Sequence, residues 1–193
     1  MGFQYESDAK AFQEDLCKRL SKFSLGLNQD KTHLLRFGRF ARDQRPAREK
    51  HSGPKTFNFL GFTHSCGRSR AGKSVLLRRT VRERMRNKLG DLKKQMMRRR
   101  HEPLSAQGQW LGSVVRGHYE YYAVPTNTGS INAFRNEVTK LWRWALKRRS
   151  HRSRLPWSRM HGIAKKWLPY GRTKHPWPNA RFDANNRGRS PVR

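Results

Sequence analysis

The stretch Gly117-His118-Tyr119-Glu120-Tyr121-Tyr122-Ala123-Val124-Pro125-Thr126-Asn127 decides the fold of this chain. Its aromatic residues continue a stripe at helical spacing that begins at Trp110, and its Pro-Thr-Asn end is typical of a turn. A basic helix follows, in which Leu141-Trp142-Arg143-Trp144-Ala145-Leu146-Lys147-Arg148-Arg149-Ser150 combines tryptophans with arginines. The order of aromatic helix, turn and basic helix predicts two helices joined by a short connection.

Apolar residues at helical spacing predict three helices in this part of the chain. One starts at residue 78, one ends near residue 122 and one covers 130–149. Their stripes are Val81, Met85, Leu89, Leu92 and Met96; Trp110, Leu111, Val114, Val115, His118, Tyr119 and Tyr122; and Ile131, Phe134, Val138, Leu141, Trp142 and Ala145. Short connections predict that the helices form a small bundle. The aromatic residues assigned to its core are Trp110, Tyr119, Phe134 and Trp142, and His118 is assigned to packing rather than to catalysis.

The residues before the bundle predict one helix and two or three short strands. Residues 8–23 have an amphipathic helical pattern, whereas 32–37 and 57–63 have the short apolar runs of strands. Residues 41–56 are typical of an exposed loop. From Pro156 onward the chain holds five prolines and little periodicity. We therefore expect an α+β fold with a first domain at 1–77, a helical domain at 78–155 and an irregular basic tail at 156–193.

The charge of the chain points to a polyanionic partner. It carries 44 Lys and Arg against 13 Asp and Glu, a formal net charge of +31. Such a charge repels itself unless a polyanion neutralises it, and nucleic acid is the usual one. A membrane surface is the alternative, but no run of about 18 apolar residues occurs. The first residues also lack the pattern of a signal peptide. We therefore expect nucleic acid, and no membrane, as the partner.

The cysteine content predicts neither a disulfide scaffold nor a metal site. Cys17 and Cys66 are the only two cysteines, and they lack the paired spacing of zinc ligands. His64 lies close to Cys66, but two ligands without further partners are a weak basis for a metal site. The sequence thus predicts no metal and a reducing, cytoplasmic location.

Five stretches of this chain, in their order and spacing, resemble motifs of bacterial group II intron-encoded reverse transcriptases. The stretch at 117–127, the tryptophan-rich helix and Leu155-Pro156-Trp157-Ser158-Arg159-Met160 resemble their maturase-specific region, also called domain X or the thumb. Leu25-Gly26-Leu27-Asn28-Gln29-Asp30-Lys31-Thr32 resembles the sixth conserved block of reverse transcriptases, and Phe57-Asn58-Phe59-Leu60-Gly61-Phe62 resembles the seventh, the primer grip. The resemblance covers residues 3–182 and rests on the order and spacing of short motifs.

This resemblance implies a C-terminal fragment of such an enzyme, with part of the palm at 1–77 and the thumb at 78–155. In the intact enzyme, Lys31 would lie near the active site as a candidate catalytic residue, and Phe59, Leu60 and Gly61 would form the primer grip. RNA-directed DNA synthesis needs acidic residues that hold two Mg²⁺ ions, yet no Asp-Asp pair occurs in this chain. The chain would begin just after the family's Tyr-Ala-Asp-Asp motif. We therefore expect no catalytic residue and no Mg²⁺ in this chain itself.

The basic residues carry the expected binding of RNA. No carboxylate occurs between Glu137 and Asp183, whereas thirteen Lys and Arg residues and five of the six tryptophans do. Guanidinium groups bind phosphates, and planar groups stack on unpaired bases. The residues expected to contact nucleic acid are Arg79, Arg82, Arg86, Lys93, Arg100, Lys147, Arg148, Arg149, Arg152, Arg154, Trp157, Arg159, Lys165 and Lys166. For Trp157, Trp167 and Trp177, which lie off the stripes, base stacking and packing both fit.

Three functions are compatible with these patterns. The first is an RNA-binding fragment that helps a group II intron fold and splice and, in the intact mobile-element enzyme, holds the template–primer duplex. The second is the split half of an RNA-directed DNA polymerase, completed by a separate N-terminal half. The third is a generic basic RNA-scaffold protein, against which the motifs at 25–32 and 57–62 argue.

Overall fold

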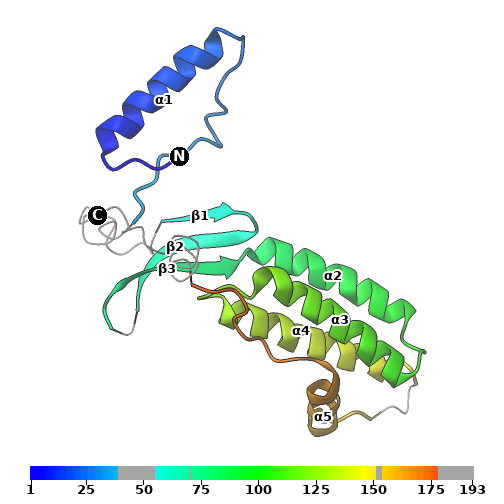
Figure 1. Ribbon diagram of the computed structural model, residues 1–193. Helices are drawn as coiled ribbons and strands as arrows, with labels where there is room; N and C mark the ends of the chain where they lie inside the picture. Colours follow the sequence, from blue (N-terminus) through cyan, green and yellow to red (C-terminus); the bar gives the residue numbers. More distant parts are fainter. Residues whose placement is uncertain (39–54, 70, 151–153, 178–193) are drawn as a thin grey trace. The chain divides into compact units, whose positions relative to one another are not determined.

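The computed structural model describes residues 1–38, 55–69, 71–150 and 154–177. Within them, five helices and a three-stranded antiparallel sheet make an α+β fold (Figure 1). The chain divides into two compact units, Met1–Lys55 and Thr56–Arg193. The division therefore falls before the sheet, whereas the sequence suggested a boundary after residue 77. None of the described helices combines the length and the apolar character needed to cross a membrane.

The first unit contains the helix α1 (Glu6–Ser21) and has little core of its own. Among its described residues, Ala9 is the one buried apolar side chain. Lys10 and Arg36 both bond to the Glu6 carboxylate and lower its pKa to about 2. Residues 32–37 are not a strand, so that prediction was wrong. An extended segment becomes a strand only when a neighbour completes its hydrogen bonds, and none of the described residues of this unit does.

The second unit opens with a hairpin and a third strand. Strands β1 (Thr56–Phe59), β2 (Phe62–Arg68) and β3 (Ser74–Thr80) pair in that order. The sequence predicted one strand over 57–63, but Leu60 and Gly61 interrupt it with φ of 47° and 81°. Two consecutive residues with positive φ make the tight turn that suits the twist of a two-residue hairpin. Phe59 consequently pairs with Phe62 across the turn.

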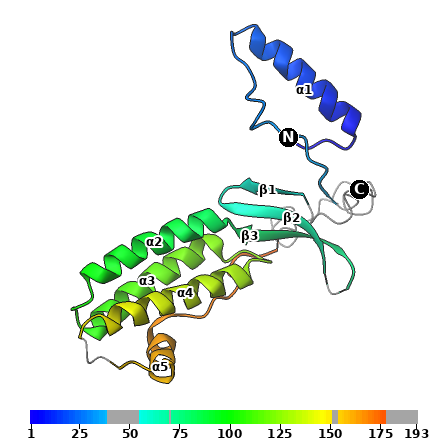
Figure 2. The ribbon, with the colours of Figure 1, turned by 180° about the vertical axis from the view of Figure 1, so that it is seen from behind.

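Three helices lie side by side beyond the sheet (Figures 1 and 2): α2 (Arg82–Arg98), α3 (Leu104–Tyr122) and α4 (Thr128–Lys147). They share one core, in which Phe134 and Trp142 have no exposed surface and Tyr119 is 2% exposed. Trp110 is partly buried against this core. These positions confirm the aromatic core predicted from the helical spacing.

A fifth helix, α5 (Trp157–Trp167), packs against α3 and α4. The prediction of an irregular tail from Pro156 was wrong for these residues. Met160 and Ala164 are buried, and Ile163 and Trp167 pack against the same core. Their spacing of three and four residues is that of an amphipathic helix, although the flanking prolines obscured it.

The chain then returns from α5 along the bundle toward the sheet (Figure 1). The backbone N–H of Gly171 donates to Asn132 of α4 at 3.0 Å. Farther on, the N–H groups of Lys174 and His175 donate to the carbonyl oxygen of Ala123, at 2.9 and 3.3 Å. Residues 168–177 therefore fasten α5 to the junction between α3 and α4.

Candidate nucleic-acid interface

The Pro125-Thr126-Asn127 turn binds the sheet to the helical bundle. The backbone N–H of Arg78 donates to the Thr126 hydroxyl at 2.8 Å, and that of Thr80 donates to Asn127 Oδ1 at 3.0 Å. Asn127 Nδ2 donates to Thr80 Oγ1 at 3.0 Å and to the carbonyl of Tyr122 at 2.8 Å. Although Asn127 precedes α4, its side chain does not cap that helix. The turn thus fixes β3 against the end of α3.

The hairpin tip Phe59-Leu60-Gly61 is both exposed and held in place. Phe59 is 58% exposed and Leu60 is 64% exposed. Tyr121 donates its hydroxyl to the Leu60 carbonyl at 2.6 Å, and the N–H of Val81 donates to the Gly61 carbonyl at 3.0 Å. A Cβ at Gly61 would lie 3.1 Å from the hydroxyl of Tyr122. The three residues expected to form a grip therefore present two apolar side chains on a turn fixed by α3.

His118 is a packing residue of α3. Its ring stacks on Phe134, with centroids 3.8 Å apart, and on Tyr122 at 4.5 Å. Burial, and then the nearby charge of Lys88, lower its pKa to about 4, so the imidazole is neutral near pH 7. Its buried Nε2 has no hydrogen-bond partner in the described part of the chain. A neutral, enclosed ring of this kind supports packing rather than proton transfer.

The basic flank of α2 is largely exposed. Arg82, Arg86 and Lys93 are exposed, and Lys93 Nζ lies 5.0 Å from the centroid of the Trp144 ring. Arg79 precedes them as an exposed residue of β3. Arg100, by contrast, lies beyond the end of α2, is half-buried and donates to the carbonyl of Met97 at 3.2 Å. It is therefore not part of the helical flank on which we had expected it.

The end of α4 separates binding candidates from structural arginines. Lys147 and Arg148 are exposed, and the Arg148 guanidinium lies over the Trp144 ring at 4.0 Å. Arg149 is half-buried and donates to the carbonyl of Glu102 in the α2–α3 connection. Arg149 thus ties two segments of the bundle together, whereas Arg148 leaves its charge at the surface.

The segment around α5 supplies the remaining predicted contacts. Arg154, Arg159, Lys165 and Lys166 are all exposed, and Trp157 is 42% exposed. Arg152 lies outside the described residues. The Trp157 ring faces the guanidinium of Arg143 at 4.4 Å, and the Trp167 ring is partly buried against the core. Exposed Trp157 thus suits stacking, whereas Trp167 packs.

Several structural residues were missed by sequence reasoning because their partners are distant in the chain. Arg135 is 7% exposed and donates to the carbonyls of Leu168 and Ala164 at 3.2 and 3.5 Å. Gln107 is 1% exposed and accepts a hydrogen bond from the indole of Trp142 at 2.8 Å. A polar residue within an apolar stripe was the available signal in both cases, but it did not name the partner.

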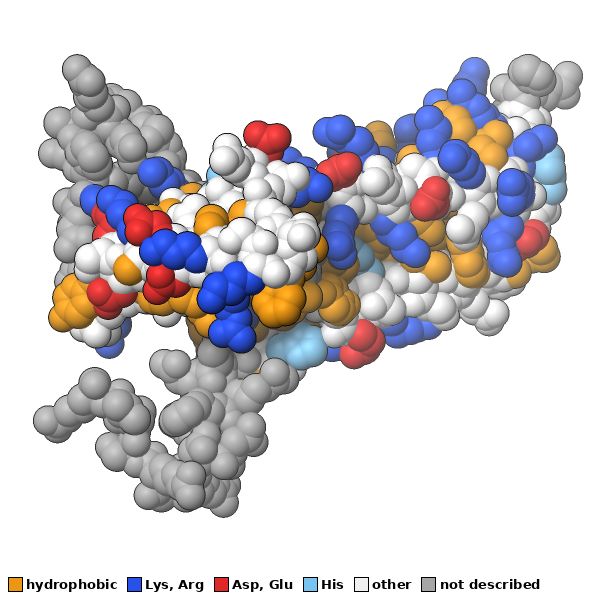
Figure 3. Space-filling model, turned by 90° about the horizontal axis from the view of Figure 1, so that it is seen from above, with side chains coloured by type: hydrophobic (Ala, Val, Ile, Leu, Met, Phe, Trp, Pro, Cys, Tyr) orange, Lys and Arg blue, Asp and Glu red, His pale blue; other side chains and the backbone are white. Residues whose placement is uncertain are grey.

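The basic residues predicted to contact nucleic acid share one property, the lack of a carboxylate partner among the described residues. Among the described residues expected to bind nucleic acid, none forms an ion pair with a described carboxylate. The described ion pairs of this unit join Arg99 to Glu102, Lys140 to Glu137 and Lys174 to Glu120. Figure 3 shows Lys and Arg side chains spread over the helical bundle, with few Asp and Glu side chains among them. The surface can therefore accept a polyanion without breaking existing ion pairs.

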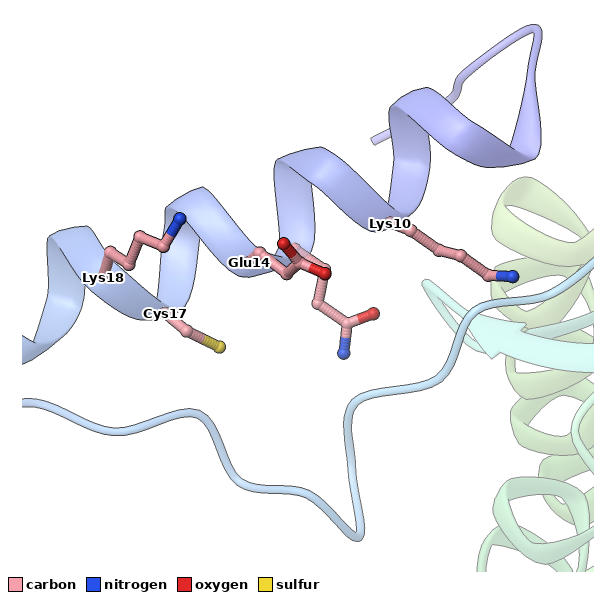
Figure 4. A pocket seen from close by; sticks show the side chains of 5 residues that line it. Lys10, Glu14, Cys17 and Lys18 are labelled. Atoms are coloured by element: carbon pink, nitrogen blue, oxygen red, sulfur yellow. The ribbon is translucent and has the colours of Figure 1, made fainter.

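The described residues of the first unit offer no comparable site. A hollow of about 600 Å³ is lined by Lys10, Gln13, Glu14, Cys17 and Lys18, all of which belong to α1 (Figure 4). A single helix provides no second wall, and both charge signs are present. Lys31 lies in a turn, where its backbone N–H bonds to Asn28 Oδ1 at 3.1 Å, and it is exposed. No group of three His, Cys, Asp or Glu side chains among the described residues is placed to hold a metal ion.

Comparison with protein-family models, with curated proteins and with solved structures gives no match to this chain.

Proposed function

We propose that this chain binds RNA through the helices of its second unit, as the C-terminal portion of a group II intron reverse transcriptase/maturase. In this role it assists the folding and splicing of the intron RNA. In the intact enzyme the same unit holds the template–primer for DNA synthesis, which uses Mg²⁺ bound elsewhere in that enzyme. The motif resemblance suggests this role, and the exposed basic surface of the second unit gives it a physical basis.

One observation carries the proposal: exposed cations without carboxylate partners lie next to tryptophan rings. Lys93 and Arg148 both face Trp144, at 5.0 and 4.0 Å from its ring centroid. Phosphate contacts supply most of the affinity of basic proteins for nucleic acid, and aromatic rings add stacking on unpaired bases.

The geometry of the motifs adds support. Tyr121 and Asn127 of the aromatic stretch bind the hairpin tip and β3 by hydrogen bonds that span 61 and 47 residues. The two motifs that resemble a primer grip and a thumb thus belong to one connected structure. A generic RNA-scaffold protein would need a basic surface but no such link between these motifs.

The split-polymerase alternative is favoured by the first unit. Phe23 and Leu25 there are 69% and 59% exposed, so the described residues of this unit leave large apolar side chains uncovered. A separate N-terminal half would supply the missing cover under that hypothesis.

A charge substitution on the bundle tests the proposed RNA surface. We would replace Lys93, Arg148, Arg154 and Arg159 by Gln, since all four side chains are exposed and none forms an ion pair with a described carboxylate. The matched control replaces Lys10, Lys18, Arg19 and Lys22 of the first unit by Gln, with the same loss of net charge. Affinity for a folded group II intron RNA is measured against salt concentration, beside an RNA duplex of equal length.

Affinity falls with salt, so the slope of log affinity against log salt is negative. In the bundle variant this slope should become less steep by about 0.7–0.9 for each lost phosphate contact, and the control should change it little. Circular dichroism of both variants checks the fold. Equal losses in both variants would mean that only the total charge matters. An unchanged slope in the bundle variant would place the RNA surface elsewhere.

A further inference from the structure

Two arginines of α4 each lie against an aromatic ring that remains open to solvent. The guanidinium of Arg143 is 4.4 Å from the centroid of Trp157, and that of Arg135 is 3.9 Å from the centroid of Tyr170. Trp157 is 42% exposed and Tyr170 is 62% exposed. The two rings lie just inside the start of α5 and just beyond its end.

Main-chain carbonyls hold both arginines in position. Arg143 Nε donates to the carbonyl of Leu155 at 2.9 Å, and Arg135 Nε donates to that of Leu168 at 3.2 Å. Neither guanidinium has an ion-pair partner among the described carboxylates. Each ring is therefore backed by a fixed cation whose charge is not neutralised by an acid of the described chain. Proteins that bind single-stranded nucleic acid combine such aromatic rings with cation–π contributions from arginine.

The spacing allows two bases to be held at once. Arg135 and Arg143 are eight residues apart on one helix, which separates them by about 12 Å along its axis. Stacked bases on one strand repeat at about 3.4 Å, so the two platforms would take bases that are not direct neighbours in a stack. A regular duplex keeps its bases paired and offers no such free faces.

Packing alone explains these two rings less well than it explains the other aromatic residues. Trp142 is fully buried, and its indole N–H bonds to Gln107. Trp167 fills the space over Gly108, where a Cβ would lie 2.5 Å from its ring. Trp157 and Tyr170 instead remain 42% and 62% exposed.

We propose that Arg143 with Trp157 and Arg135 with Tyr170 are two stacking platforms for unpaired bases. The unit then recognises single-stranded or looped segments of RNA, in addition to attracting phosphates. This inference rests on the proposed RNA-binding function and deepens it, because it names the class of RNA segment that is bound.

The test compares Trp157→Ala and Tyr170→Ala with Tyr5→Ala, a control in the first unit whose side chain is 63% exposed and has no described cation over its ring. The probes are a single-stranded RNA oligonucleotide and a blunt RNA duplex with the same number of phosphates. Each platform variant should lose roughly 5- to 150-fold in affinity for the single strand, the effect of removing one stacked base. Duplex affinity and the salt slope should stay unchanged, as should both affinities of the control variant.

Trp157→Phe and Tyr170→Phe keep a planar ring, so they should retain most of the single-strand affinity and show that the loss does not come from unfolding. Equal losses on both probes, or no loss on the single strand, would overturn the platforms. If the unaltered chain bound neither probe, the proposed function itself would fail. Binding of both probes by the unaltered chain, without any effect of the substitutions, would overturn only this inference.

Discussion

Asn127 shows how one side chain can organise several segments. It is fully buried, and its amide bonds to the backbone of β3, to a hydroxyl on β3 and to the last carbonyl of α3. Buried polar groups are costly unless they are paired, so these bonds fix the distance between sheet and bundle rather than adding a large net energy. The turn motif that suggested a connection in the sequence is, in the structure, the joint of the second unit.

Replacement of Asn127 by Ala should destabilise the second unit by about 2 to 4 kcal/mol, because it leaves the buried Thr80 N–H without its partner and removes the two hydrogen bonds that Asn127 Nδ2 donates to Thr80 Oγ1 and to the Tyr122 carbonyl. The control is Asn136→Ala, an exposed position on α4, where the change should stay within about 0.5 kcal/mol. Urea unfolding followed by tryptophan fluorescence measures both. Similar unfolding midpoints for the two variants would show that water replaces the hydrogen bonds of Asn127 without loss of stability.

At the scale of elements, α3 depends on glycine where α5 crosses it. A Cβ at Gly108 would lie 2.5 Å from the Trp167 ring, and one at Gly112 would lie 2.8 Å from the Trp167 carbonyl oxygen. Gly117, on the same helix, has open space around it. The contact between the helices therefore requires the close approach that only a residue without a side chain permits, and α5 owes its position to it.

Substitution by Ala should change the stability in opposite directions at Gly108 and Gly117. Gly108→Ala forces Trp167 aside and should cost about 1–3 kcal/mol. Gly117→Ala should add about 1 kcal/mol, since alanine favours the helix and meets no neighbour. Chemical denaturation of the two variants, together with the fluorescence of the tryptophans, measures this difference. A stabilised Gly108→Ala variant would mean that α5 is not seated on α3 in solution.

At the scale of the whole molecule, the two units differ in how much core they possess. The second unit buries a continuous set of apolar side chains from all four of its described helices, with Leu111, Phe134, Trp142 and Met160 completely enclosed. The first unit has one buried apolar residue among those described, Ala9. Burial of apolar surface is the main source of folding free energy, so the units should differ in stability.

Hydrogen exchange should show this difference directly. Backbone amides of α3 and α4 should exchange at least about a thousandfold more slowly than those of α1, which corresponds to about 4 kcal/mol in opening free energy. Mass spectrometry of peptides from each helix, on the full chain at two concentrations, provides the measurement. Equal protection of α1 would contradict the prediction, and a dependence on concentration would then identify a second copy as the cover.

The sequence by itself determined the three bundle helices, their aromatic core and the excess of positive charge. An amphipathic helix shows apolar residues at intervals of three or four along the sequence. Phe134 and Trp142 could therefore be assigned to the core without knowledge of the residues they contact. Net charge needs no structure at all. The hairpin turn at Leu60 and Gly61 was missed because the short apolar run over 57–63 fits a single strand as well as a hairpin. The helix α5 was missed because its apolar stripe is short and prolines flank it.

Only the tertiary structure decided which basic residues remain available to a partner. Arg148, Arg149 and Arg143 lie close together in the sequence, yet one is exposed, one binds a carbonyl of the α2–α3 connection and one backs the ring of Trp157. Their roles depend on segments up to 47 residues away, and no local pattern contains that information. The physical reason is that periodicity reports which face of a helix is apolar, whereas the contacts of a charged side chain depend on which distant carbonyl or ring the folded chain brings beside it.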